Sequence, residues 1–81
     1  MKINQNEFST FDLGLATVLI TVGYKLIRME KSNPKKVKFV FEKDKDIERT
    51  IEDFWNDELK VRAQTLLNNQ KVLKNRIYSN V

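Results

Sequence analysis

Residues 36–42 have the sequence Lys-Val-Lys-Phe-Val-Phe-Glu, in which polar and apolar side chains alternate. In an extended strand, side chains two positions apart point to the same face, so Val37, Phe39 and Phe41 share one face. The two lysines of the run lie on the opposite face, toward solvent. This alternation predicts a strand that is buried on one side, and the rest of the chain must supply the cover for its apolar face.

A second extended segment, residues 24–30, precedes this strand. The residues between the two segments include Asn33-Pro34, a pair that favours turns because asparagine hydrogen-bonds its own backbone and proline presets φ. We therefore predict a β-hairpin with a loop of about five residues. An isolated hairpin is only marginally stable in water, so its apolar face requires helices packed against it.

Residues 11–22, before the hairpin, are predicted to form a buried helix. Ser9 and Thr10 can cap it, and Asp12 falls in the first turn, where the helix dipole favours an acid. Apolar residues recur at helical spacing around most of the circumference, and Gly23 stands where a helix commonly ends with positive φ. The many β-branched residues make a strand the alternative, which the absence of strict alternation disfavours.

Two further helices are predicted after the hairpin. Asp44 or Asp46 can cap the first of them, and its apolar residues fall on one helical face: Ile47, Ile51, Phe54 and Trp55. The last helix runs from about residue 62 to residue 78. Between the two, residues 59–61 form a short extended connector that can pair at the hairpin edge as a third strand. These elements predict an α+β fold of order α-β-β-α-α, with three helices on one side of a small antiparallel sheet.

The composition indicates one small globular domain, residues 1–81, with residues 1–8 expected to form a flexible N-terminus. Apolar residues make up 41% and charged residues 32% of the chain, which is typical of a globular rather than a disordered protein. The absence of cysteine excludes disulfides and thiolate metal sites, and it favours a reducing, cytoplasmic location. The most apolar stretch, residues 13–22, is half as long as the ~20 residues of a membrane-spanning helix, so we expect no membrane partner.

No residue pattern points to catalysis or to a bound cofactor. Histidine, the commonest general base and metal ligand, is absent. There is no glycine-rich loop to hold a phosphate, and the acidic residues lack the spacing of a calcium loop. A chain this small also has little room for a sizeable substrate pocket. We therefore expect no enzyme, no cofactor, no metal site and no small-molecule substrate, and instead a non-enzymatic binding module.

The net charge of +4 is unevenly distributed. Residues 25–45 carry eight basic and three acidic side chains, a net of +5, and residues 59–81 carry five basic side chains and no acid. Residues 46–58 carry one basic and six acidic side chains, a net of −5. Because lysine and arginine bind phosphate with release of counterions, the two basic segments form the best candidate site for nucleic acid. Its predicted residues are Lys25, Arg28, Lys31, Lys35, Lys36 and Lys38 of the hairpin, and Lys71, Lys74 and Arg76 of the last helix.

Alternatives to this nucleic-acid site remain open. Lysines on edge strands prevent edge-to-edge aggregation, and abundant lysine and asparagine also fit the codon bias of an AT-rich genome. The chain can instead be a protein-interaction or oligomerisation module, an accessory or mobile-element protein of bacterial or phage origin. Such a module would use charge complementarity and an exposed aromatic anchor, for which the candidates are Trp55 and Phe8. Tryptophan is enriched at interface hot spots, although the need of a small core for large side chains favours a buried Trp55.

The order of several short motifs resembles a small bacterial family of domains of unknown function. The residues that carry the resemblance are Asp12-Leu13, Leu15-Ala16, Gly23, Asn33-Pro34, residues 39–42 and residues 73–79. In that family a helix ending in glycine leads into a hairpin, whose aromatic-x-aromatic-acid strand is followed by two helices. The family pattern places Asp-Pro after the connector, where this chain has Arg62-Ala63. The resemblance covers residues 8–79 and implies this fold, with no activity, ligand or functional residue.

Overall fold

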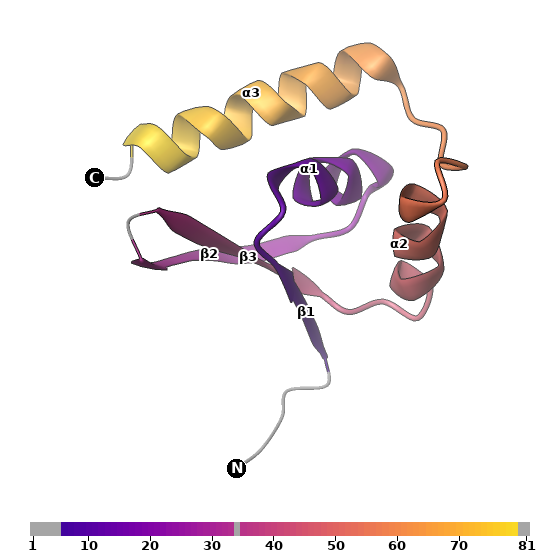
Figure 1. The fold of residues 1–81 in the computed structure, drawn as a ribbon, viewed down its shortest axis with the longest axis horizontal. Coiled ribbons are helices and arrows are strands. Elements are labelled where there is room, and N and C mark those ends of the chain that lie inside the picture. The colour runs from indigo at the N-terminus through magenta and orange to yellow at the C-terminus, as the bar shows by residue number, and fades with distance from the viewer. Residues whose placement is uncertain (1–5, 34, 80–81) are drawn as a thin grey trace.

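The computed structural model describes residues 6–33 and 35–79, which form a three-stranded antiparallel sheet with helices packed on one face (Figure 1). In chain order the elements are β1 (Glu7–Thr10), α1 (Leu13–Val22), β2 (Leu26–Asn33), β3 (Lys36–Glu42), α2 (Ile47–Trp55) and α3 (Ala63–Ser79). The predicted α+β class is confirmed. The predicted order α-β-β-α-α is also present, preceded by one additional strand.

The strand that was predicted from its alternating residues, β3, lies at the centre of the sheet, in the order β1-β3-β2. Its Phe41 pairs with Phe8 of β1 on one side and with Leu26 of β2 on the other. Phe39 and Phe41 are buried, whereas Lys36 is exposed. The central position explains why β3 has the clearest alternation of polar and apolar residues. Strands on both sides and helices on one face restrict which side chains fit at each of its positions.

The strand that the sequence analysis did not predict is β1. It pairs with β3, so Glu7 and Phe8 belong to the sheet rather than to the flexible N-terminus that was expected over residues 1–8. Residues 1–5 of that terminus lie outside the described residues. The third strand expected at residues 59–61 is wrong, because these residues connect α2 to α3 without strand pairing. The edge of β3 that the connector could have joined is already occupied by β1.

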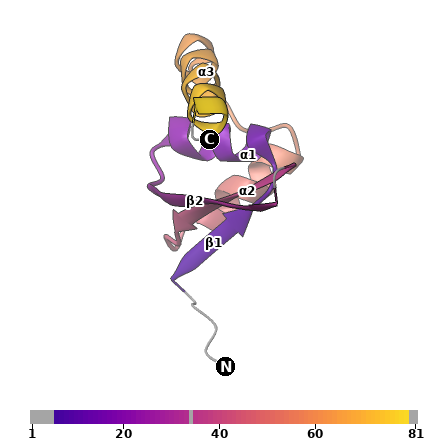
Figure 2. The same ribbon diagram turned by 90° about the vertical axis from the view of Figure 1, so that its left-hand side faces the viewer.

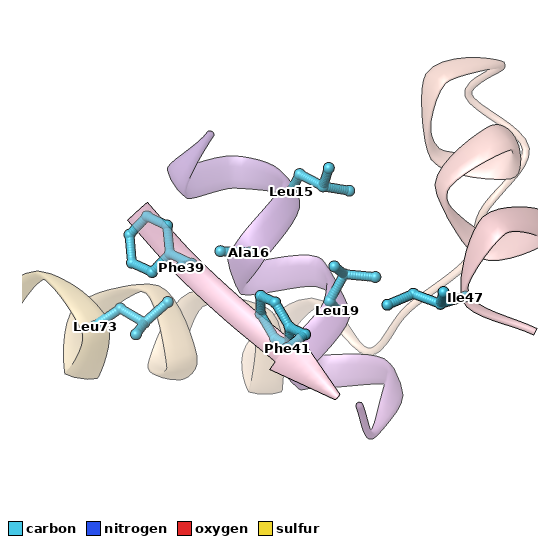
Figure 3. Close-up of a cluster of buried hydrophobic side chains, with 7 residues drawn as sticks. All are labelled: Leu15, Ala16, Leu19, Phe39, Phe41, Ile47 and Leu73. Atoms are coloured by element: carbon cyan, nitrogen blue, oxygen red, sulfur yellow. The ribbon is translucent and has the colours of Figure 1, made fainter. Parts of the chain in front are cut away.

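The core lies between the sheet and α1 and is closed by α2 and α3 (Figure 3). Its buried cluster consists of Leu15, Ala16 and Leu19 of α1, Phe39 and Phe41 of β3, Ile47 of α2 and Leu73 of α3. Seen edge-on, α1 lies next to the sheet and α3 passes over α1 (Figure 2). The C-terminal half of α3 extends past α1 toward the hairpin, where Leu73 reaches the core. The end of α3 therefore comes to lie beside the hairpin turn.

The first turn of α1 is capped by Asp12, whose Oδ1 accepts a hydrogen bond from the Leu15 amide at 3.1 Å. The caps predicted at Ser9 and Thr10 are wrong, because both residues are paired with β3 as part of β1. The helix consequently begins at Leu13. Phe11, which was expected inside this helix, therefore lies before it.

The last turn of α1 ends at Gly23, which has a φ of 122°, a conformation that other residues rarely adopt. The Gly23 amide donates to the carbonyl of Ile20, and the Tyr24 amide donates to that of Leu19 at 2.9 Å. These two hydrogen bonds satisfy carbonyls at the helix end that lack a partner within the helix. The predicted glycine stop is confirmed.

Gly23→Ala is expected to lower the free energy of unfolding by about 1–2 kcal/mol, the cost of a Cβ in the left-handed region. A Cβ at this position would meet no atom within 4 Å, so the loss comes from the backbone alone. The melting temperature of a domain of this size should fall by roughly 4–16 °C. Thermal unfolding followed by circular dichroism measures the shift, and an unchanged melting temperature would contradict the assigned strain.

Trp55 lies at the exposed end of α2, and the core position favoured for it is wrong. Its side chain is 62% exposed. Ile47, Ile51 and Phe54 occupy the inward face of α2. Trp55 is the final helical residue and lies about 100° further round the axis than Phe54, which turns it toward solvent.

Candidate nucleic-acid interface

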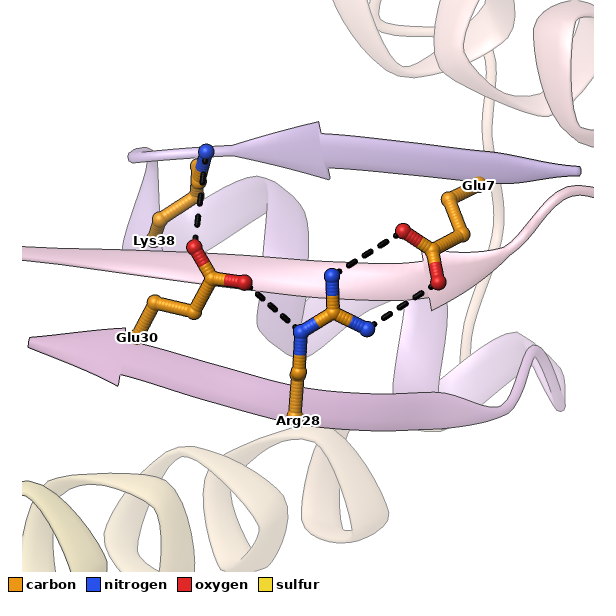
Figure 4. Close-up of polar contacts among 4 residues, drawn as sticks. All are labelled: Glu7, Arg28, Glu30 and Lys38. Atoms are coloured by element: carbon orange, nitrogen blue, oxygen red, sulfur yellow. Dashed lines mark hydrogen bonds and ion pairs between the residues drawn. The ribbon is translucent and has the colours of Figure 1, made fainter. Parts of the chain in front are cut away.

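Two of the predicted cations, Arg28 and Lys38, lie on the open face of the sheet within an ion-pair network (Figure 4). Arg28 reaches from β2 across β3 to Glu7, and its two terminal nitrogens donate to the two carboxylate oxygens at 3.0 and 3.1 Å. Its Nε donates to Glu30 at 2.6 Å, and Lys38 pairs with the other oxygen of Glu30 at 3.5 Å. Bidentate guanidinium–carboxylate pairs are strong and directional. These two cations therefore link the three strands across the open face of the sheet, and carboxylates oppose their charges.

The network also accounts for the burial of Val40, which points to the open face and is nevertheless only 2% exposed. Val40 is the β3 residue paired with Arg28 in the register of the sheet. The Arg28 side chain crosses β3 in this region on its way to Glu7. Long basic side chains commonly cover apolar surface with their stems while the charged head stays in water. Arg28 thus has a packing role in addition to its ion pairs.

The hydrogen bonds from Arg28 are the largest cause that lowers the pKa of Glu7 and of Glu30 below the ordinary value of 4.5. A carboxylate whose pKa is lowered by folding stabilises the protein above its unfolded pKa. This stabilisation is lost as the pH falls through the folded pKa. We therefore expect the difference in stability between the wild type and Arg28→Met to be largest near neutral pH and to shrink once the pH falls below 4.5.

Urea unfolding midpoints, measured from neutral pH down to about pH 3, test this expectation. Lys25→Met is the matched control, because Lys25 is an exposed cation outside the network, and it should leave the acid dependence unchanged. A difference between the wild type and Arg28→Met that stays constant across the range would show that the ion pairs do not stabilise the fold.

Lys25 and Arg76 lie apart from the other predicted cations. Lys25 stands at the open end of the hairpin, far from the turn, where its carbonyl accepts the Glu42 amide at 3.0 Å. Arg76 follows Lys74 by two residues on α3, which is about 200° round the helix axis. The side chains of Arg76 and Lys74 therefore leave different faces of the helix.

The turn end of the hairpin and the C-terminal end of α3 lie side by side (Figure 1). The Nζ of Lys31, on β2, donates a hydrogen bond to the carbonyl of Ile77 in the last turns of α3. A cation at this end of a helix also interacts favourably with the negative end of the helix dipole. Lys31 thereby fastens the hairpin to α3, and two segments that are distant in sequence form one surface.

A pocket of about 240 Å³ opens where these two segments meet. Its walls are Phe11, Leu13, Lys35, Val37, Phe39, Ile77 and Tyr78. The side chains of Phe11 and Tyr78 are 60% and 76% exposed. The Nζ of Lys36 lies 5.5 Å from the centroid of the Phe11 ring, within the range of a cation–π attraction. Aromatic and basic side chains therefore share this pocket and its rim.

Exposed lysines continue from this pocket along α3. Lys74 and Lys71 precede Tyr78 by four and seven residues, which places all three on one helical face. We call Lys35 and Lys36 of the hairpin together with Lys71 and Lys74 of α3 the basic stripe. The structure thus places Lys35 and Lys36 at the pocket, and Lys74 and Lys71 on the helical face that Tyr78 shares. The hydrogen bond from Lys31 to Ile77 joins the two elements.

A second hollow, of about 230 Å³, lies between α1, α2 and α3. Its walls are Gly14, Thr17, Val18, Phe54, Leu66, Leu67 and Gln70. Trp55, a predicted protein-contact residue, packs against Phe54. The two ring centroids are 4.8 Å apart in an edge-to-face arrangement. Phe8, the other predicted contact residue, packs partly buried against the core. Phe8 is therefore not an exposed anchor, whereas Trp55 is exposed.

The sequence analysis did not include the two aromatic residues of the first pocket, Phe11 and Tyr78, among the candidate site residues. Phe11 had been placed inside the first helix, where its spacing suggests an inward position. Recognition of Asp12 as the cap would have placed Phe11 in the corner between β1 and α1. Tyr78 lies about 100° round α3 from Ile77, which packs against the core, and this spacing was the available signal for its exposure.

Within residues 6–33 and 35–79, no cluster of three or more acidic side chains is arranged to hold a metal ion. Among the helices of this described part, none has both the length and the apolar character to cross a membrane.

Comparison with known proteins gives a family but no function. A family model described as a domain of unknown function (DUF5659) matches residues 5–79, almost the same range as the resemblance seen in the sequence. No curated protein and no solved structure matches the chain significantly. The expectation of a small domain family without an assigned activity is confirmed, and the chain belongs to the DUF5659 family.

Proposed function

We propose that this protein is a non-enzymatic binding module that contacts nucleic acid through the basic stripe. The observation that carries the proposal is the junction of the hairpin turn with the C-terminal end of α3, held by Lys31 and Ile77. Through this junction, the end of the hairpin that carries Lys35 and Lys36 lies next to the helix that carries Lys71 and Lys74. Lysines spread along one surface suit a phosphate backbone, which binds with release of its counterions.

The placement of acidic groups supports this choice of surface. Glu7 and Glu30 are engaged with Arg28 and Lys38 on the open face of the sheet. Asp12, which adjoins the pocket, accepts the Leu15 amide as the cap of α1. The acidic segment that includes α2 lies at the opposite end of the molecule from the C-terminus of α3 (Figure 1). An approaching phosphate backbone would therefore meet mainly positive charge at the stripe.

Fluorescence anisotropy of labelled single- and double-stranded oligonucleotides at several salt concentrations tests the proposal. Four phosphate contacts on a single strand should weaken binding roughly 50-fold between about 50 and 200 mM salt. A salt-insensitive signal, or no binding at the lowest salt, would overturn it.

Self-association is the second candidate function, and exposed Trp55 beside the apolar hollow favours it. In the sequence, Asp53 directly precedes Phe54 of this hollow, and Lys71 directly follows Gln70. A second copy related by a two-fold axis would set each copy's lysines against the other's acids.

The chain also lacks cysteine, which supports a cytoplasmic setting for either function.

Analytical ultracentrifugation over a range of protein concentrations tests this second candidate. Trp55→Ala should abolish a concentration-dependent dimer. Val72→Ala is the matched control, because Val72 is 56% exposed and lies about 140° round α3 from Leu67 of the hollow. A wild type that stays monomeric at all concentrations would exclude the dimer.

A further inference from the structure

The two exposed rings of the pocket come from opposite ends of the described chain. Phe11 stands at the corner between β1 and α1, and Tyr78 stands in the last turn of α3. Neither ring belongs to the buried cluster or to the partly buried residues packed against it. Single exposed aromatic residues are ordinary on protein surfaces. Two that line one pocket, with lysines at its rim, form an arrangement that core packing does not require.

The chemistry of the pocket is divided between an apolar floor and a cationic rim. Leu13, Val37 and Ile77 line it together with the two rings. Lys35 is part of the wall, and the ammonium of Lys36 lies 5.5 Å from the centroid of the Phe11 ring. A flat, weakly polar group that carries a phosphate close by would be complementary to both parts. A nucleotide within a strand has this composition.

The size of the pocket limits what can enter it. At about 240 Å³, it is slightly smaller than the roughly 300–1,000 Å³ that small-molecule sites usually occupy. It therefore suits a single ring system, while the sugar and phosphate of the same nucleotide remain outside at the lysines. In a duplex, both faces of each base are covered by its neighbours, so only an unpaired base can stack on a protein ring.

We infer that Phe11 and Tyr78 hold one unpaired nucleobase, so that the protein prefers single-stranded to double-stranded nucleic acid. The inference rests on the proposed function, because the basic stripe must first bring the strand to the pocket. Lys35 and Lys36 neutralise the phosphates next to the bound base, and Lys74 and Lys71 follow the strand along α3. Stacking on aromatic side chains tolerates any base, so no sequence preference is expected from the pocket alone.

The test compares two labelled probes by fluorescence anisotropy: a thymidine oligonucleotide and an abasic oligonucleotide of the same length. Both carry the same phosphates, and only the first can stack. The wild type should bind the thymidine probe roughly 5- to 150-fold more tightly, the range that loss of base stacking produces. Phe11→Leu/Tyr78→Leu should bind both probes with the affinity that the wild type has for the abasic probe.

Controls separate this inference from the function on which it rests. Val22→Ala removes an exposed apolar side chain outside the pocket and should keep the preference for the thymidine probe. Since Phe11 and Tyr78 are mostly exposed, their leucine variants should keep the wild-type circular dichroism spectrum. Equal binding of both probes by the wild type would overturn the inferred base pocket, while binding of nucleic acid through the basic stripe would be retained. No binding of either probe would overturn both.

Discussion

Phe41→Ala is expected to lower the free energy of unfolding by about 3–5 kcal/mol, the usual cost of removing a buried phenylalanine side chain. Phe41 is fully buried on the central strand and packs in one cluster with Leu19 and Ile47. The protein as a whole should have about 4–12 kcal/mol of stability, at 0.05–0.15 kcal/mol per residue. The single change therefore removes a large part of the total, and at the lower bound it unfolds the protein.

Urea unfolding at 25 °C, followed by circular dichroism, measures the effect. Trp55→Ala is the matched control, because it removes a larger aromatic ring from an exposed position. Loss of its edge-to-face contact with Phe54 should cost about 0.5–1.5 kcal/mol, well below the cost at Phe41. If Trp55→Ala cost as much as Phe41→Ala, the assignment of one residue to the core and the other to the surface would be wrong.

Replacing the four lysines of the basic stripe by glutamine is expected to weaken binding of single-stranded nucleic acid by at least about 100-fold at low salt. Each lost phosphate contact removes one released counterion, and the slope of log affinity against log salt should fall from roughly −3 toward zero. The side chains are exposed, so the fold should survive the change. Anisotropy titrations at several salt concentrations give both the affinity and the slope.

The control variant removes the same total charge elsewhere, by changing Lys25, Lys45, Arg49 and Lys60 to glutamine. These four residues are exposed and lie outside the stripe. If binding depends only on net charge, both variants should lose affinity equally, and the stripe would have no special role. If the stripe is the site, the control should retain most of the affinity and nearly the full salt slope.

Local patterns explain why most elements could be predicted. The alternation around Phe39 and Phe41 marked β3, and the spacing of Ile47, Ile51 and Phe54 marked α2, because these periods follow from strand and helix geometry. The short strand β1 has no comparable signal. Its four residues are mostly polar, and their extended conformation comes from pairing with the edge of β3.

The candidate site shows the same division. Nine basic residues could be named from charge alone, yet charge could not show that Arg28 is held by Glu7, which lies 21 positions away along the chain. Nor could it show that Lys31 reaches Ile77, 46 positions away. These contacts determine which cations face a carboxylate on the sheet and which one joins the hairpin to α3.

By itself, the sequence determined the α+β class, the order of the helices and the hairpin, and the identity of the central strand. These properties depend on the periodicity of apolar residues over a few turns or strand positions. Only the tertiary structure decided that β1 completes the sheet, that Trp55 is exposed, and that Phe11 and Tyr78 meet at a pocket rimmed by lysines. Such features arise from the packing of segments that are distant in sequence, and no local pattern records which distant residue will become a neighbour.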